Sequence, residues 1–90
     1  MTTHPYKEKF ERGTAVRIAP LDALEHFRRT WKYHHPLFER QLMFFSMTTV
    51  VEDVSYYHGG DVLYDLRGVP GIWHEELLEP ASDTNNERNT

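Results

Sequence analysis

The sequence contains no cysteine, which excludes several classes of structure and chemistry at once. Without thiols the chain forms no disulfide, no thiolate metal site and no cysteine-based active site. Positive charge is also scarce: 10 Lys and Arg stand against 14 Asp and Glu, giving a formal net charge of −4 with neutral histidines. A chain with this balance has no overall attraction for nucleic acid or anionic lipid.

Long hydrophobic runs are missing as well. The longest apolar stretch, around 42–51, is interrupted by Ser46 and two threonines and is too short to cross a bilayer. The first nine residues are polar and contain Pro5, so they do not form the apolar segment of a secretory signal. We therefore expect a cytoplasmic, soluble protein without membrane association.

What the chain does contain is enough for one small domain. Hydrophobic residues make up 39% of its 90 residues and aromatic residues 13%, which is sufficient for a modest core. Both ends are dominated by polar residues. We predict a flexible N-terminal arm over 1–12, a single globular domain over 13–80 and a disordered tail over 81–90.

The most informative stretch, 48–66, predicts a β-hairpin around which the rest of the chain is organised. Two runs rich in β-branched and aromatic residues flank the turn His58-Gly59-Gly60-Asp61, whose glycine pair suits a tight connection between strands. Glu52 interrupts the apolar face of the first run, which indicates either a β-bulge or an edge position close to it.

Shorter segments complete the predicted elements. Alternating apolar and polar residues over 14–19 indicate a half-buried strand that ends at Pro20. Apolar residues at helical spacing predict a helix over 21–33 with Asp22 as its N-cap. The stretch 37–47 fits either a helix or the start of a strand, and we favour a short helix over 37–43 followed by extended chain. The remaining predictions are a turn over 67–71, a closing strand at 72–73 and one helical turn over 74–78.

This order of elements indicates an α+β fold, a small and strongly bent antiparallel sheet or partly open barrel with a helical insertion after the first strand. Two segments resemble small SH3-like barrels: 10–18, where a glycine precedes the first strand, and 62–80, in which 62–66 and 73–80 are similar to their late strands and terminal turn. Such barrels occur as the C-terminal domain of the nitrile hydratase β subunit and as accessory subunits of photosynthetic electron-transfer complexes. The resemblance implies a docking or covering role beside a catalytic partner.

The resemblance carries no functional residue over to this chain. The stretch 21–47 has a helical pattern here, whereas the nitrile hydratase family has a loop rich in proline and arginine at that place. Fold analogy also assigns no function by itself, because one fold supports many activities.

Histidine is the residue type with the widest chemical scope in this sequence. Four of the six form a candidate ligand set for a metal or small ligand: His34, His35, His58 and His74. Glu75 and Glu76 would add oxygen ligands to such a set. No two of the four have the i, i+4 spacing of a helical metal site, and residues in turns and at helix ends would show the same pattern. We predict no bound metal and no cofactor.

No catalytic motif stands out. Ser46 and Ser55 lie in strand-like sequence without the pattern of a nucleophile elbow, and a glycine-rich phosphate loop is missing. A chain of this length also rarely builds a deep pocket within one protomer. We expect no enzymatic activity and name no catalytic residue.

Two groups of residues suggest a binding function. Arg28, Arg29 and Trp31 place cations beside an aromatic ring, an arrangement that binds single-stranded nucleic acid but also occurs on ordinary solvated helix faces. Tyrosine and tryptophan around the hairpin favour protein docking, because they bury apolar area and keep one polar group. We predict a non-catalytic interaction module or accessory subunit that binds another protein or itself. Its predicted contacts are Arg28, Arg29, Tyr57, His58 and Trp73.

Overall fold

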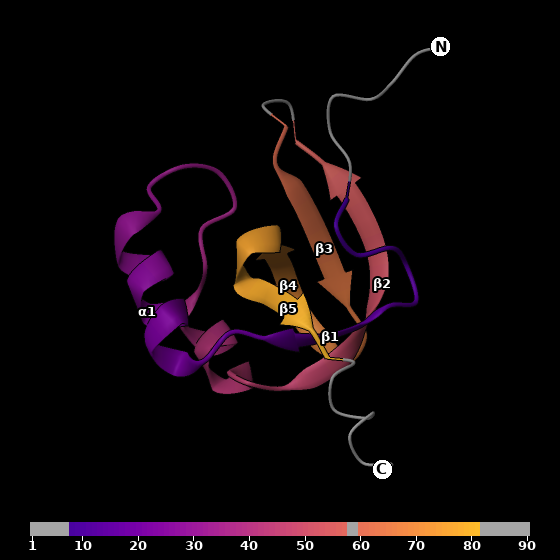
Figure 1. Cartoon of the computed structure of the whole chain (residues 1–90). Coiled ribbons are helices and arrows are strands. Elements are labelled where there is room, and N and C mark those ends of the chain that lie inside the picture. The colour runs from indigo at the N-terminus through magenta and orange to yellow at the C-terminus, as the bar shows by residue number, and fades with distance from the viewer. Residues whose placement is uncertain (1–7, 58–59, 82–90) are drawn as a thin grey trace.

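In the part of the chain that the structure describes, five antiparallel strands and one α-helix make up the fold (Figure 1). The structure, a computed structural model, describes residues 8–57 and 60–81. The strands are β1 (Ala15–Ile18), β2 (Thr48–Tyr56), β3 (Val62–Leu66), β4 (Val69–His74) and β5 (Leu78–Pro80). The helical segments are α1 (Leu21–Thr30) and the 3₁₀ segments η1 (Glu39–Phe44) and η2 (Glu75–Leu77).

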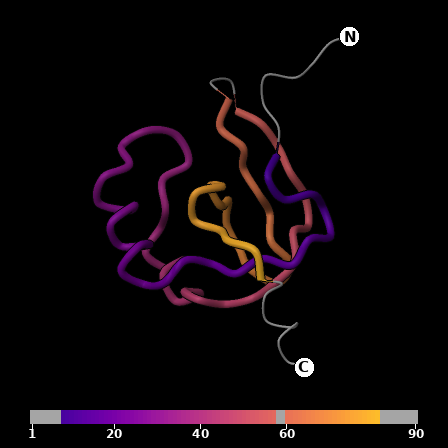
Figure 2. The backbone as a smooth tube through the Cα atoms, viewed as in Figure 1, coloured from indigo at the N-terminus to yellow at the C-terminus, as the bar shows by residue number. Residues whose placement is uncertain are grey.

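The strands form a single sheet in the order β4-β3-β2-β1-β5, so the last strand returns beside the first. The sheet is bent but not closed, since β4 and β5 are its two edges. Figure 2 shows the long connection from β1 to β2, which contains α1 and η1, standing to one side of the strands. The predicted α+β class, antiparallel sheet and helix after the first strand are confirmed.

The predicted hairpin is β2 and β3, with Val54 opposite Tyr64 and Tyr56 opposite Val62. The register of this pair shifts between Val51 and Asp53, so the bulge lies where Glu52 predicted it. The tip, 58–59, is outside the described residues. Gly60 has a φ of +102°, a left-handed conformation that glycine adopts without Cβ strain.

The core collects apolar side chains from the sheet, from α1 and from the segment before β1. Leu24 and Phe27 lie on the buried face of α1, one turn apart, and pack with the strand residues. Phe10 is 4% exposed and joins the same cluster. The largest fully buried side chains are Trp73 and Tyr64, on neighbouring strands.

The helix α1 is shorter than predicted. It ends at Thr30, and Trp31 follows in an extended conformation. Its N-cap is Pro20 rather than Asp22, and no side chain caps it; Asp22 lies in the first turn instead, where a carboxylate complements the helix dipole. Among the described residues this ten-residue helix is the longest, and none has the length and hydropathy of a membrane span.

The other differences concern short segments. The predicted helix over 37–43 is the 3₁₀ segment η1, displaced by one to two residues toward the C-terminus. The strand β4 starts at Val69, immediately after a turn at Gly68, and so includes residues predicted as turn. The helical turn near 74–78 is confirmed as η2, whereas β5 was not predicted.

Candidate functional site

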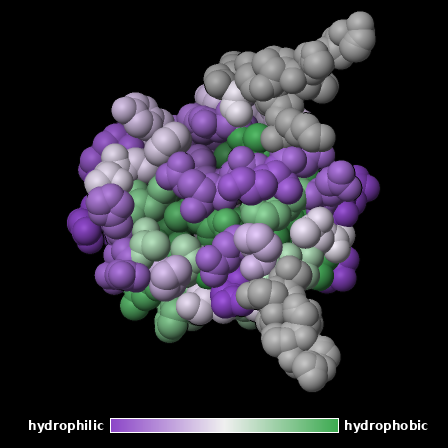
Figure 3. All heavy atoms as spheres, viewed as in Figure 1, coloured by the Kyte–Doolittle hydropathy of each residue, from purple (hydrophilic) through white to green (hydrophobic). Residues whose placement is uncertain are grey.

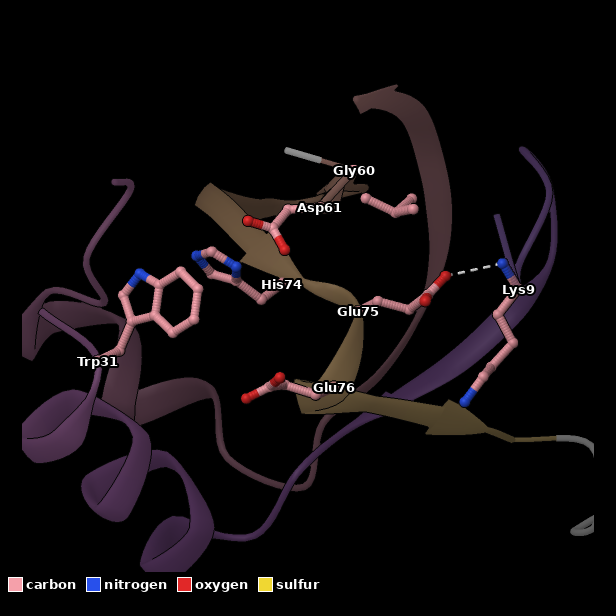
Figure 4. A pocket seen from close by; sticks show the side chains of 8 residues that line it. Lys9, Trp31, Gly60, Asp61, His74, Glu75 and Glu76 are labelled. Atoms are coloured by element: carbon pink, nitrogen blue, oxygen red, sulfur yellow. Dashed lines mark hydrogen bonds between the residues drawn. The ribbon is translucent and has the colours of Figure 1, made fainter. Parts of the chain in front are cut away.

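A pocket of about 220 Å³ opens where four segments distant in sequence meet (Figure 4). Trp31 follows the end of α1, Gly60 and Asp61 come from the hairpin, and three residues come from the end of β4 and the turn after it. These last residues are His74, Glu75 and Glu76. Lys9 lies at the side of Glu75.

Hydrogen bonds of three histidines connect the segments around this pocket. The Trp31 Nε1–H donates to the backbone oxygen of His34 at 2.7 Å. The Nε2 of His34 lies 2.6 Å from Oδ2 of Asp61, and its Nδ1 lies 2.9 Å from Nδ1 of His35. The Nε2–H of His74 donates to the backbone oxygen of His35 at 2.8 Å. The connection 31–36 is thereby attached to both the hairpin and β4.

Aromatic rings surround the same network. The His34 ring stacks on Tyr57, with centroids 3.8 Å apart and planes 15° from parallel. Trp31 stacks on Phe27 at 5.2 Å and meets the edge of Tyr33 at 4.9 Å. Tyr33 is 70% exposed and Tyr57 is 37% exposed, so two aromatic residues reach solvent next to the pocket.

A second network fixes Glu75 on the opposite side of the pocket. The Tyr64 hydroxyl donates to Oε2 of Glu75 at 2.5 Å, and the backbone N–H of Lys9 donates to the same oxygen at 2.7 Å. The backbone N–H of Phe10 donates in turn to the Tyr64 hydroxyl. Burial, followed by the hydrogen bond to Glu75, raises the pKa of Tyr64 above its usual value, so the hydroxyl keeps its proton.

The electrostatics of His74 differ from those of an exposed histidine. The residue is 4% exposed, and burial together with the charge of His34 lowers its pKa. A neutral His74 whose Nε2–H donates to a carbonyl carries a lone pair on Nδ1. This Nδ1 has no hydrogen-bond partner in the described part of the chain.

Three members of the predicted histidine set are neighbours in the structure. The ring centroids of His34 lie 5.0 Å from His35 and 5.7 Å from His74. His58 is outside the described residues. Within 8–57 and 60–81, no three His, Asp or Glu side chains are arranged to hold a metal ion. The histidine nitrogens do not converge on one point because both ring nitrogens of His34 and the Nε2 of His74 lie at hydrogen-bond distance from other protein groups.

The predicted partner contacts are scattered over the molecule. Tyr57 lies beside the pocket, while Arg28 and Arg29 are exposed in the last turn of α1. Trp73 is a correction: it is 0% exposed and paired opposite Tyr64, so its ring belongs to the core and offers no surface to a partner. Trp31 is half-buried and held by Phe27, which removes one ring face from stacking on a base.

Sequence reasoning missed two features of the surface. Glu76 was treated only as a spare metal ligand, although it lines the pocket together with Trp31. Exposed hydrophobic side chains also follow the connection through η1, which the pattern of 37–47 did not separate from core residues: Phe38, Met43, Phe45 and Met47. Figure 3 shows hydrophobic residues at the lower left of the molecule, the part of the view that holds α1 and η1.

Comparison with protein-family models, with curated proteins and with solved structures finds no match to this chain in any of the three.

Proposed function

We propose that this chain is a non-catalytic protein-interaction domain, which docks a segment of another protein across the pocket. The observation that carries the proposal is an open pocket bordered by exposed aromatic residues. Tyr33, 70% exposed, contacts the edge of Trp31, and Tyr57 stacks on the histidine that holds Asp61. Tyrosine is enriched in interfaces because it supplies a large, rigid contact area and a polar group at little entropic cost.

An interaction role suits this pocket better than catalysis. The His34–Asp61 pair has the form of a general base and its orienting group, but among the described lining residues there is no serine or threonine hydroxyl for it to activate. Glu75 is occupied by the Tyr64 hydroxyl and the Lys9 amide. Asp61 and Glu75 therefore hold chain segments in position. The exposed rings of Tyr33 and Tyr57, which we call the aromatic rim, remain as the contact surface.

The proposal includes an SH3-like relationship and an accessory role. Three features support this proposal: β5 returns to pair with β1, the single helical turn η2 joins β4 to β5, and a long connection, or excursion, with α1 and η1 joins β1 to β2. These features agree with the resemblance of 10–18 and 62–80 to small SH3-like barrels. In such an arrangement the excursion and the hairpin supply the contact surface, and the sheet is the rigid support.

Site-specific crosslinking tests the docking function. A photo-reactive amino acid replaces Tyr33 at the rim in one variant and Asp65, exposed on β3, in a matched control. We expect the rim position to form one stoichiometric protein adduct in cell extract, and the control position to form none. Adducts of equal yield at both positions, or none at either, would contradict the proposal; an adduct with a second copy of the chain would identify self-association.

A further inference from the structure

The described lining of the pocket holds more carboxylates than cations: Asp61 bonds the His34 ring and Glu75 accepts from Tyr64 and Lys9, whereas Glu76 is left over. Among the described residues that line it, Asp61, Glu75 and Glu76 carry carboxylates, and Lys9 is the only one with a cationic side chain. The Lys9 ammonium lies 5.9 Å from the centre of the Phe10 ring, and Figure 4 shows Lys9 on the far side of Glu75 from Trp31. Glu76 makes no hydrogen bond or ion pair with any residue that the structure describes.

A hydrogen-bond acceptor faces the same space. His74 is 4% exposed, lines the pocket, and uses Nε2 to bond the backbone of His35. The lone pair on its Nδ1 is left without a donor within the described chain. Since no buried side-chain nitrogen or oxygen of the described residues lacks a partner, this Nδ1 is open to solvent, and a ligand N–H can donate to it in place of water.

The pocket also has a fixed aromatic wall. Trp31 is held on one face by Phe27 and at its N–H by the backbone oxygen of His34, so its orientation is set before any ligand arrives. Figure 4 shows its six-membered ring turned toward His74, with the Asp61 carboxylate above and the Glu76 carboxylate below. Planar cations pack well against indole rings.

We infer that this pocket binds a guanidinium group, supplied by an arginine side chain of the docked segment. The inference rests on the proposed docking function and specifies the chemistry of the partner. The groups around Trp31 are hydrogen-bond acceptors or a π surface, and guanidinium combines positive charge, five donors and a flat apolar face. A metal ion matches less well, since within the described residues no three ligands converge on one point.

A titration with single amino-acid derivatives tests the inference. N-acetyl-arginine amide, N-acetyl-lysine amide and N-acetyl-citrulline amide are added to the ¹⁵N-labelled full chain. We expect arginine to shift the Trp31 indole N–H and the Gly60 amide at millimolar concentration, lysine to bind more weakly, and neutral citrulline to leave both signals in place. The indole N–H of buried Trp73 is the internal control and should not shift.

A pair of variants assigns the binding to the pocket. Glu76→Gln removes a carboxylate that bonds no described residue, and we expect arginine to bind about two- to fivefold more weakly, the effect of one solvent-accessible ion pair. Glu25→Gln, which removes the same charge from the exposed surface of α1, should bind like the parent chain. Raising the salt concentration should weaken binding to the parent chain and to the Glu25 variant.

Three results would overturn the inference: equal shifts with citrulline, lysine binding as tightly as arginine, or equal affinity in the Glu76 and Glu25 variants. The crosslinking test keeps the two proposals apart. A rim-specific adduct without arginine binding would leave the docking function standing and remove the guanidinium site. Arginine binding without a rim adduct would leave a pocket for small cations and remove the docking function.

Discussion

Among single residues, Tyr64 combines a buried ring with a hydroxyl that bonds several partners. Its ring is in the core, while its hydroxyl donates to Glu75 and accepts the backbone N–H of Phe10. Tyr64→Phe keeps the ring but leaves a carboxylate and a buried N–H without this partner. We expect the free energy of unfolding to fall by about 1–3 kcal/mol, measured by urea denaturation.

The matched control for this change is Tyr33→Phe, because Tyr33 is 70% exposed and its hydroxyl bonds no described residue. Its stability should stay within about 0.5 kcal/mol of the parent chain. If the two variants were equally stable, the hydroxyl of Tyr64 would not be holding the segment before β1 in place.

At the scale of elements, the contact between η1 and β4 requires a glycine at position 71, because Gln41 fills the space that a side chain there would need. Gln41 is 1% exposed; its Oε1 accepts the Phe38 N–H, and its Nε2 donates to the backbone oxygen of Ile72. A Cβ on Gly71 would lie 2.7 Å from that Nε2. Gly71→Ala therefore displaces the buried amide and strains a φ of +95°, so we expect a loss of about 2–4 kcal/mol in the free energy of unfolding.

Gly68→Ala separates the two causes of this loss. Gly68 also has a positive φ, +73°, but a Cβ there meets nothing within 4 Å. We expect the free energy of unfolding of this variant to fall by about 1–2 kcal/mol, the cost of placing a Cβ at a positive φ. Thermal or urea denaturation of both proteins gives the comparison, and a Gly68 variant as unstable as the Gly71 variant would remove Gln41 from the explanation.

For the molecule as a whole, His74 makes stability depend on pH. Because burial lowers its pKa in the folded state, the unfolded chain binds a proton that the folded chain resists. The free energy of unfolding should therefore fall as the pH drops from about 6.5, the pKa of histidine in the unfolded chain, toward the lower pKa of His74 in the folded chain. Above about pH 6.5 His74 is neutral in both states and no longer affects stability. Urea denaturation between pH 7.5 and 5 measures the slope.

The variant His74→Gln should reduce that slope, since the amide can still donate to the backbone of His35 but does not titrate in this range. His26→Gln is the control, because His26 is exposed on α1 and lies away from the buried network. A slope that survives in the His74 variant and disappears in the His26 variant would contradict the assignment.

Several local features could be predicted from the sequence because their causes are local. The hairpin, the bulge at Glu52 and the turn near Glu75 follow from the two-residue alternation of strands and from turn-forming residues. The three-residue strand β5 gave no such signal. It exists because β1 offers it an edge to pair with, which a window of sequence does not contain.

The pocket, in contrast, was decided only by the tertiary structure. His35 and His74 are 39 positions apart and meet because the connection after α1 lies against the strand end that pairs with β3. Alternation along β4 predicts that Trp73 and His74 point to opposite faces of the sheet, but not which of the two faces packs against the core. That choice depends on the neighbouring elements, which is why Trp73 was wrongly predicted as a partner contact. The amino-acid sequence alone determined β1, the hairpin of β2 and β3 and the turn near Glu75, through short-range steric preferences, whereas chain packing determined β5 and which side chains share a pocket.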